Sequence, residues 1–176
     1  TQADAQLCIL KDMINVRQDA ICIPTQGRTI YSSSAPVQVV NFRQSVIGKD
    51  KLSFTFDVVL SGNVDVFWSK EKRKPVTFDS GCPRNPTERR AVENNVGVTI
   101  PEIPADPLFS DLRCGGLDGG STGVVRMING RRTITCTASI VQDRLDLEKG
   151  VGILLEYNVL DNKETPILIK HLASSP

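Results

Sequence analysis

Histidine is almost absent from this chain, and so is every cysteine spacing that binds zinc. The one histidine among the 176 residues is His171, and no two cysteines stand at CxxC spacing. A Cys2His2 zinc site therefore cannot form, and a Ser-His-Asp or Cys-His site would depend on that single side chain. His171 instead lies in ILIKHL at 167–172, an alternating segment typical of a strand. Because no carboxylate spacing locates a hydrolase site either, we expect a protein that is not an enzyme.

An excess of charge of one sign is also missing. The chain has 21 Lys and Arg against 20 Asp and Glu, which gives a net charge of +1. This balance provides no overall field that would attract nucleic acid or an anionic membrane. No apolar run approaches the roughly 20 residues that a membrane-spanning helix needs. We expect no nucleic-acid partner and no membrane span in this chain.

Five widely spaced cysteines are present: Cys8, Cys22, Cys82, Cys114 and Cys136. In a strand-rich sequence without zinc spacing they favour disulfides, and with them an oxidising, extracellular or cell-surface environment. Buried free thiols in a cytosolic protein are the alternative. The chain begins TQADAQ without a methionine, which fits a mature protein after removal of a leader, an excised ectodomain or an arbitrary boundary.

The pairing of the cysteines cannot be deduced from their spacing. Cys136 and Cys114 form one candidate pair, because a bridge that closes about 20 residues stabilises by roughly 3 kcal/mol in the chain-entropy model. Cys22 could join Cys82 or Cys8. One of the five must stay free or link to another chain, and Cys8, near the terminus, is our candidate.

The stretch RMINGRRTITCTASI at 126–140 predicts a hairpin. Asn129-Gly130 suits a type I′ turn, which needs positive φ at both central residues. After the turn, apolar residues alternate with Thr and Ser, so Cys136 points towards the core. A two-residue loop would place two pairs opposite each other, Val125 with Ile134 and Met127 with Arg132, with Val125 and Met127 on the buried face.

Short strands separated by turn residues dominate the chain from residue 36. Alternation is clearest at 52–60, where Leu52, Phe54, Phe56, Val58 and Leu60 share one face. The predicted strands cover 35–47, 52–60, 64–68, 95–103, 125–127, 133–140, 151–159 and 167–172. Seven to eight antiparallel strands without a helix predict an all-β fold, a β-sandwich spanning 36–176.

The first 35 residues differ in character from the rest. Leu7, Leu10, Ile14 and Arg17 lie at helical spacing, but two extended pieces joined near 17–19 would fit as well. We therefore expect residues 1–35 to form an N-terminal extension, either a short helix or a strand. Fully extended, it could reach roughly 110 Å, far enough to dock on a neighbouring molecule.

The segment VQVVNFRQSVIGKDKLSFTFDVVLSGNVDVFW, residues 37–68, resembles the start of immunoglobulin-like sandwich modules in secreted and surface proteins of prokaryotes. These include the CARDB-like (cell-adhesion-related) modules and the heads of archaeal pilus subunits. The resemblance implies an immunoglobulin-like fold and a structural, adhesive or assembly role on a cell surface. The chain departs from true immunoglobulin domains because its only tryptophan, Trp68, does not lie between two intersheet cysteines. It also lacks the long apolar N-terminal helix of a type IV pilin.

Two polar segments are candidate binding sites. The segment 69–94 is rich in basic residues that could hold an acidic glycan or partner, or could simply be solvated; they are Lys70, Lys72, Arg73, Lys74, Arg84, Arg89 and Arg90. The Gly-rich segment 104–123 carries Asp106, Asp111 and Asp118, which could gather around Ca²⁺ or could be exposed loop aspartates. Its glycines are more typical of tight turns and close chain approach than of a phosphate cradle, since no GKS/T follows.

The functional hypothesis combines these features. We expect an extracellular subunit that assembles with copies of itself into a surface filament, pilus or layer. Its N-terminal segment would contact a neighbour, for example by adding a strand to an exposed sheet edge. The alternative is a monomeric cell-surface module that binds glycan or protein through the basic segment or the Asp/Gly segment.

Overall fold

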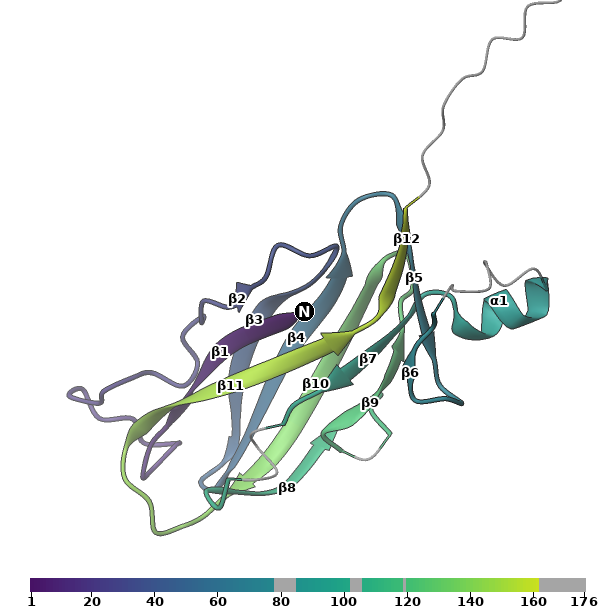
Figure 1. The fold of residues 1–176 in the computed structure, drawn as a ribbon. Helices are drawn as coiled ribbons and strands as arrows, with labels where there is room; N and C mark the ends of the chain where they lie inside the picture. Colours follow the sequence, from purple (N-terminus) through teal and green to yellow (C-terminus); the bar gives the residue numbers. More distant parts are fainter. Residues whose placement is uncertain (78–84, 102–105, 119, 162–176) are drawn as a thin grey trace, which may run out of the picture.

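The computed structural model describes residues 1–77, 85–101, 106–118 and 120–161. Twelve strands and one short helix lie in this part of the chain (Figure 1). In order they are β1 (Gln2–Ile9), β2 (Tyr31–Ser32), β3 (Val37–Gly48), β4 (Lys51–Leu60), β5 (Val64–Ser69), β6 (Lys74–Pro75), α1 (Pro86–Val92), β7 (Asn95–Thr99), β8 (Phe109–Cys114), β9 (Thr122–Arg126), β10 (Arg131–Ile140), β11 (Leu147–Glu156) and β12 (Asn158–Asp161).

Two antiparallel sheets form a sandwich, as expected. One has the order β2-β1-β11-β7-β9 and the other the order β3-β4-β10-β8, while β12, β5 and β6 form a small third sheet. The core between the two large sheets contains three phenylalanines from one sheet, Phe42, Phe54 and Phe56, whose neighbouring rings stack at centroid distances of 5.6 and 6.5 Å. The alternation predicted for 52–60 is therefore correct for its buried face.

The N-terminal residues are part of the sandwich, which corrects the expected boundary at residue 35. β1 pairs with β11 over its full length and with β2 at two positions. Ala3, Ala5 and Leu7 are buried, and the Thr1 amino group donates a hydrogen bond to the Leu155 carbonyl oxygen at 3.0 Å. The helical alternative is also wrong. The period-2 alternation of residues 2–7 determines the local structure, and the helical spacing falls partly in the loop that follows.

The Asn129-Gly130 turn has the expected backbone but not the expected partners. Both residues have positive φ, 51° and 72°. However, β9 pairs with β7 in one sheet and β10 pairs with β4 and β8 in the other, so the turn carries the chain between sheets. Val125 lies opposite Val96, not Ile134, and the Met127 amide donates to the Asn94 carbonyl oxygen rather than pairing with Arg132. The two-residue loop is as predicted, since Ile128 and Arg131 form an antiparallel bridge across it, but the pairing predicted for Val125 and Met127 is wrong. The predicted burial of Val125, Met127 and Cys136 is confirmed.

Several elements lie where loops were expected. β8 crosses the Gly-rich segment, and α1 begins in the basic segment, where the Asn85 side chain accepts a hydrogen bond from the Thr87 amide at 2.9 Å and Pro86 occupies the first turn. The strand predicted at 151–159 is divided near Tyr157 into β11 and β12, because β12 leaves the large sheet to pair with β5. The strand predicted at 167–172, with His171, lies outside the described residues.

Candidate interaction surface

Three connections lie together at one end of the sandwich, at the lower left in Figure 1. They are the long β1–β2 connection 10–30, the β3–β4 turn at 47–51 and the β10–β11 connection 141–146. We call these residues the loop end. They meet because β1, β3 and β10 all finish at this end of the fold, and hydrogen bonds then join one connection to another.

A buried arginine holds the three connections together. The Arg144 side chain is only 1% exposed. Its Nε donates to the Leu10 carbonyl oxygen at 2.8 Å, and its Nη2 donates to that of Lys49 at 2.8 Å. Its Nη1 donates to Asp50 Oδ1 at 2.9 Å and to the Val141 carbonyl oxygen at 2.6 Å. Because a buried guanidinium needs its donors satisfied, these bonds fix the backbone at three points and hold the Asp50 side chain as well.

A disulfide fastens the long connection to β1. Cys8 is bonded to Cys22, so our expectation that Cys8 is the free thiol is wrong. The connection turns back after residue 17, where the Ala20 amide bonds to the Arg17 carbonyl oxygen, and brings Cys22 to the end of β1. The Gln44 side-chain amide also bonds to both the N–H and the C=O of Cys8, at 2.8 and 2.7 Å. Cys82 lies outside the described residues.

The second disulfide joins Cys114 to Cys136, the pair that we favoured. Cys114 is the last residue of β8, not part of a loop, and it lies directly opposite Cys136 of β10. Both strands belong to the four-stranded sheet. This bridge therefore fastens one edge of a sheet and leaves the loop end to the other disulfide.

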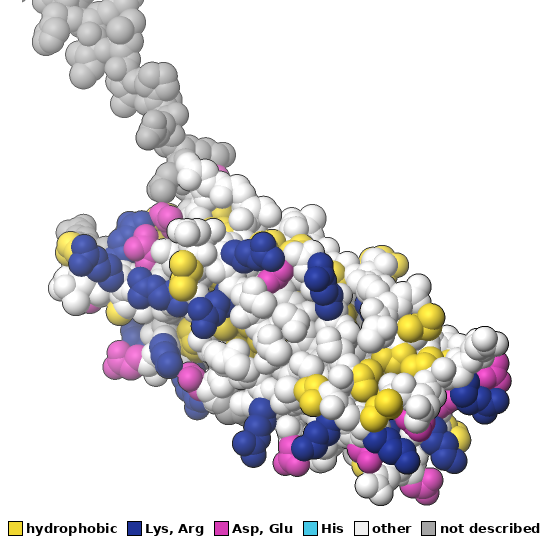
Figure 2. Space-filling view, turned by 180° about the vertical axis from the view of Figure 1, so that it is seen from behind, with side chains coloured by type: hydrophobic (Ala, Val, Ile, Leu, Met, Phe, Trp, Pro, Cys, Tyr) yellow, Lys and Arg dark blue, Asp and Glu magenta, His cyan; other side chains and the backbone are white. Residues whose placement is uncertain are grey.

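The loop end exposes an unusual amount of hydrophobic surface. Ten large hydrophobic side chains are exposed among the described residues, and seven of them belong to the loop end: Ile14, Val16, Ile21, Ile23, Ile47, Val141 and Leu145. Ile14, Val16 and Ile47 line one hollow of about 380 Å³. Figure 2 shows hydrophobic side chains gathered at the same end, at its lower right. Large exposed apolar patches are typical of surfaces that contact another protein, a membrane or a ligand.

Charged side chains of both signs surround these apolar residues. Arg17 and Asp19 form an exposed ion pair at 3.0 Å. Asp12 accepts hydrogen bonds from the backbone N–H groups of Asn15 and Ile14, both at 3.0 Å, which shapes the turn that presents Ile14. The bonds from the Asn15 backbone and side chain, and then from Ile14, hold the pKa of Asp12 below its usual value. The charges are therefore mixed, and some of them are used to shape the loops.

The basic segment is divided between a hairpin and a helix. Lys70 pairs with Asp118 at 3.1 Å, while Arg89 bonds to Asp65 and Glu93 and lies 5.5 Å above the Phe67 ring. Four basic residues of this segment, Lys72, Arg73, Lys74 and Arg90, form no ion pair with a carboxylate among the described residues. Arg84 lies outside it. The hollow that Lys72 and Lys74 line, of about 490 Å³, is also lined by Glu71 and Glu88, so it has no single sign of charge.

The three aspartates that we considered as Ca²⁺ ligands do not form one site. Asp106 forms an ion pair with Lys149 and accepts a hydrogen bond from the Leu108 amide, and Lys149 is the main reason that the pKa of Asp106 is lowered. Asp118 pairs with Lys70, while Asp111 lies exposed in β8 with φ 52°. Among the described residues no three His, Cys, Asp or Glu side chains come together as a metal site.

The glycines of the same segment have the role that we expected. A Cβ on Gly120 would lie 2.6 Å from the Leu112 carbonyl oxygen, and one on Gly123 would lie 2.3 Å from the Asp118 amide nitrogen. Both positions require close approach of two chain segments.

Comparison of the chain with protein-family models, curated proteins and solved structures finds no match. Among the described residues no helix has the length and hydrophobicity needed to cross a membrane. The resemblance of residues 37–68 to CARDB-like modules therefore stays a prediction.

Proposed function

We propose that this chain is a structural subunit of an extracellular or cell-surface assembly, and that it contacts further copies of itself through the loop end. The observation that carries the proposal is the group of seven exposed hydrophobic side chains on connections that Arg144 and the Cys8–Cys22 disulfide hold in place. Rigid loops lose little conformational entropy when they are buried in an interface, so they favour specific association.

The disulfides support the compartment in this proposal. Two bridges are compatible with an oxidising environment outside the cytosol, where secreted and surface proteins keep such bonds. A filament, pilus or layer is the kind of assembly that the resemblance to prokaryotic surface modules implies. It would need every subunit to present at least two contact surfaces to its neighbours, of which the loop end would be one.

A second copy is the partner that the charges of the loop end fit. Lys11, Arg17 and Lys49 lie on the same connections as Asp12 and Asp19, so two loop ends can meet without net repulsion. A partner with a strong net charge would gain no net electrostatic attraction from these charges of both signs. Because β1 is already paired with β2 and β11, we assign the contact to the loop end and not to strand addition by the N-terminal segment.

Sedimentation velocity across a concentration series tests the proposal. We expect the wild-type chain to associate and the double variant Ile14→Asp, Ile47→Asp to stay monomeric, since two charges then enter the hollow at the loop end. The matched control is Ile128→Asp, which changes an equally exposed isoleucine (60%) in the turn at the opposite end of β10. Equal association of the double variant, or a wild-type chain that is monomeric at every concentration, would contradict the proposal.

A further inference from the structure

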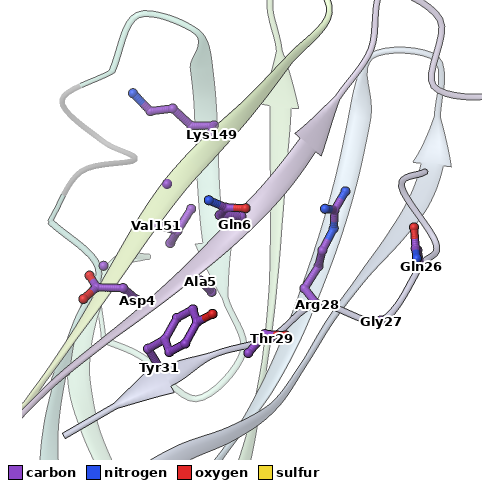
Figure 3. Close-up of a pocket in the computed structure, with 12 residues that line it drawn as sticks. Asp4, Ala5, Gln6, Gln26, Gly27, Arg28, Thr29, Tyr31, Lys149 and Val151 are labelled. Atoms are coloured by element: carbon purple, nitrogen blue, oxygen red, sulfur yellow. The ribbon is translucent and has the colours of Figure 1, made fainter. Parts of the chain in front are cut away.

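A second hollow, of about 670 Å³, lies on the outer face of the five-stranded sheet. Its lining comes from β1, from β11 and from the end of the β1–β2 connection, residues 26–31 (Figure 3). We call it the outer groove. None of the seven exposed hydrophobic side chains assigned to self-contact lines it, although residues 26–29 of its lining belong to the loop end.

Two glycines of β11 lie at the floor of the outer groove. Gln6 and Asp4 face outward from β1, and the residues opposite them on β11 are Gly150 and Gly152. A Cβ added to Gly150 would meet nothing within 4 Å. The sheet therefore offers a flat surface where side chains would otherwise stand.

On one side of the groove, the hydrogen-bonded pairing along the edge of β1 is interrupted. Alternate residues of β1 face away from β11: the Gln2 carbonyl oxygen accepts from the Ser33 amide, and Cys8 is bonded by the Gln44 side chain. Gln6 lies between them on the same edge, yet β2 pairs only with Ala3 and Asp4. Within the described chain the Gln6 N–H and C=O have no hydrogen-bond partner on this edge.

Further polar groups at the groove lack a protein partner. The Arg28 side chain is 14% exposed, and its Nη1 donates to Glu148 Oε1 at 2.7 Å. Its Nε is buried with no partner among the described residues. The side-chain amides of Gln6 and Gln26 likewise show no bond to the described protein, and Asp4 uses only Oδ1, which accepts from Gln2. Asp4, Gln6 and Gln26 are exposed, so their free polar atoms are available to a ligand, and Arg28 Nε is the buried group among them that lacks a partner in the described chain.

An exposed aromatic ring stands at the same groove. Tyr31 is 73% exposed and is the one aromatic among the ten exposed hydrophobic side chains of the described residues. Figure 3 shows its ring on the side of β1 that faces residues 26–29. Folding gains little from an aromatic ring left in water, whereas a ligand with an apolar face can stack on it.

We propose that the outer groove binds a neutral saccharide. The amides of Gln6 and Gln26 and the Asp4 carboxylate provide donors and acceptors for hydroxyl groups, and the Tyr31 ring provides a surface for the C–H face of a sugar. A neutral ligand fits because Arg28 is paired with Glu148 and Lys149 with Asp106.

An extended peptide fits the groove less well. Strand addition needs several successive free N–H and C=O groups along one edge. β2 occupies the edge at Asp4 and the Gln44 side chain occupies it at Cys8, which leaves only Gln6 open.

Titration of the ¹⁵N-labelled full chain with cellobiose, N,N′-diacetylchitobiose and mannobiose, followed by amide chemical shifts, tests the proposal. We expect at least one of the three to give saturable shifts confined to residues 4–6, 26–31 and 149–152. Tyr31→Ala should weaken that binding about tenfold, as expected for loss of an aromatic stacking surface.

Gly150→Leu provides a variant that removes no native contact. Its Cβ enters open space, so we expect an unchanged thermal midpoint, while the side chain fills the floor and abolishes sugar binding. Ile128→Ala, outside the groove, should bind as the wild type does. The loop-end double variant should also keep sugar binding, so that failure of self-association and failure of this inference are distinguishable.

No shifts with any of the three sugars would overturn the inference, as would shifts outside the groove or unchanged binding by Tyr31→Ala and Gly150→Leu. Groove shifts caused by an extended peptide but not by the sugars would also overturn it.

Discussion

An arginine organises each end of this molecule, but the two side chains have different surroundings. At the loop end Arg144 is 1% exposed and bonds to three backbone carbonyls and one carboxylate. At the other end Arg89 of α1 is 35% exposed and bonds to Asp65 and Glu93. The first fixes the course of the backbone in several connections, and the second only holds a short helix against a strand.

The two ends therefore differ in how firmly their backbone is held in place. Water screens the ion pairs of Arg89, so they contribute little to stability. The Arg144 side chain is buried, so its loss removes from the packed connections the donor that three backbone carbonyls and Asp50 share. The end that exposes hydrophobic side chains is therefore the end whose connections are most firmly held, as a contact surface requires.

Replacement of Arg144 should have the largest effect. Arg144→Met keeps most of the volume but leaves Asp50 and the carbonyls of Leu10, Lys49 and Val141 without their donor. We expect the free energy of unfolding to fall by about 3–5 kcal/mol. Urea denaturation measures this. A loss no greater than that of Arg89→Met would remove the difference between the two ends.

Removal of the Cys8–Cys22 disulfide should come next. The double variant Cys8→Ser, Cys22→Ser frees a loop with a sequence separation of 14, and we expect a loss of about 3 kcal/mol. Hydrogen exchange should become faster in residues 10–30.

The matched control is Cys114→Ser, Cys136→Ser, which removes the bridge between β8 and β10. It should lower stability by a similar amount and leave exchange in residues 10–30 unchanged. Faster exchange in residues 10–30 of both double variants would show that the Cys8–Cys22 disulfide does not stabilise the loop end specifically.

Low pH should destabilise the fold through Asp57, which lies away from the loop end. Burial raises the pKa of this carboxyl, but hydrogen bonds from Thr133 at 2.5 Å, Asn41 at 2.8 Å and Arg131 at 2.5 Å outweigh it and hold the pKa below the usual value. Since the pKa is lowered in the folded state, its contribution to stability is complete above the unfolded value of about 3.9 and is lost as the pH falls through the folded value.

Asp57→Asn should therefore lower the free energy of unfolding by about 1–2 kcal/mol at neutral pH, because hydrogen bonds to a charged acceptor are replaced by weaker ones. The difference from wild type should shrink below about pH 4. Denaturation curves across this range measure it, and a difference that does not depend on pH would show that the charge of Asp57 is not what stabilises.

The smallest effect should come from Arg89→Met. The variant loses two half-exposed ion pairs and keeps most of the contact with Phe67, so the denaturation midpoint should move only slightly. Circular dichroism during thermal unfolding measures the midpoint. A large shift would show that Arg89 stabilises the fold as much as Arg144 does.

The sequence predicted the parts of the fold that local pattern determines. Alternation at 52–60 and 133–140 located two central strands, and the Asn129-Gly130 pair located a turn with positive φ. Which strands pair across that turn could not be predicted, because β9 and β10 each find longer ladders in different sheets. Helix α1 could have been found from Asn85, Pro86 and Glu88, which form a recognisable helix start.

The candidate contact surface was harder to predict. Ile14 stands at helical spacing from Leu10, and Ile21 and Ile23 are two residues apart, so in sequence they are compatible with a buried segment. Arg144 has no local partner except the Val141 carbonyl oxygen, and its other acceptors are 94 or more residues away. Only the folded arrangement shows that this arginine is buried while the isoleucines remain exposed.

Hydrogen exchange of the wild-type chain, compared between dilute and concentrated solution, tests the central claim most directly. Association through the loop end predicts that protection increases with concentration in residues 10–30, 47–51 and 141–146 and is unchanged in α1 and the β5–β6 hairpin. Protection gained at α1 and the hairpin instead, or no concentration-dependent protection at the loop end, would contradict it.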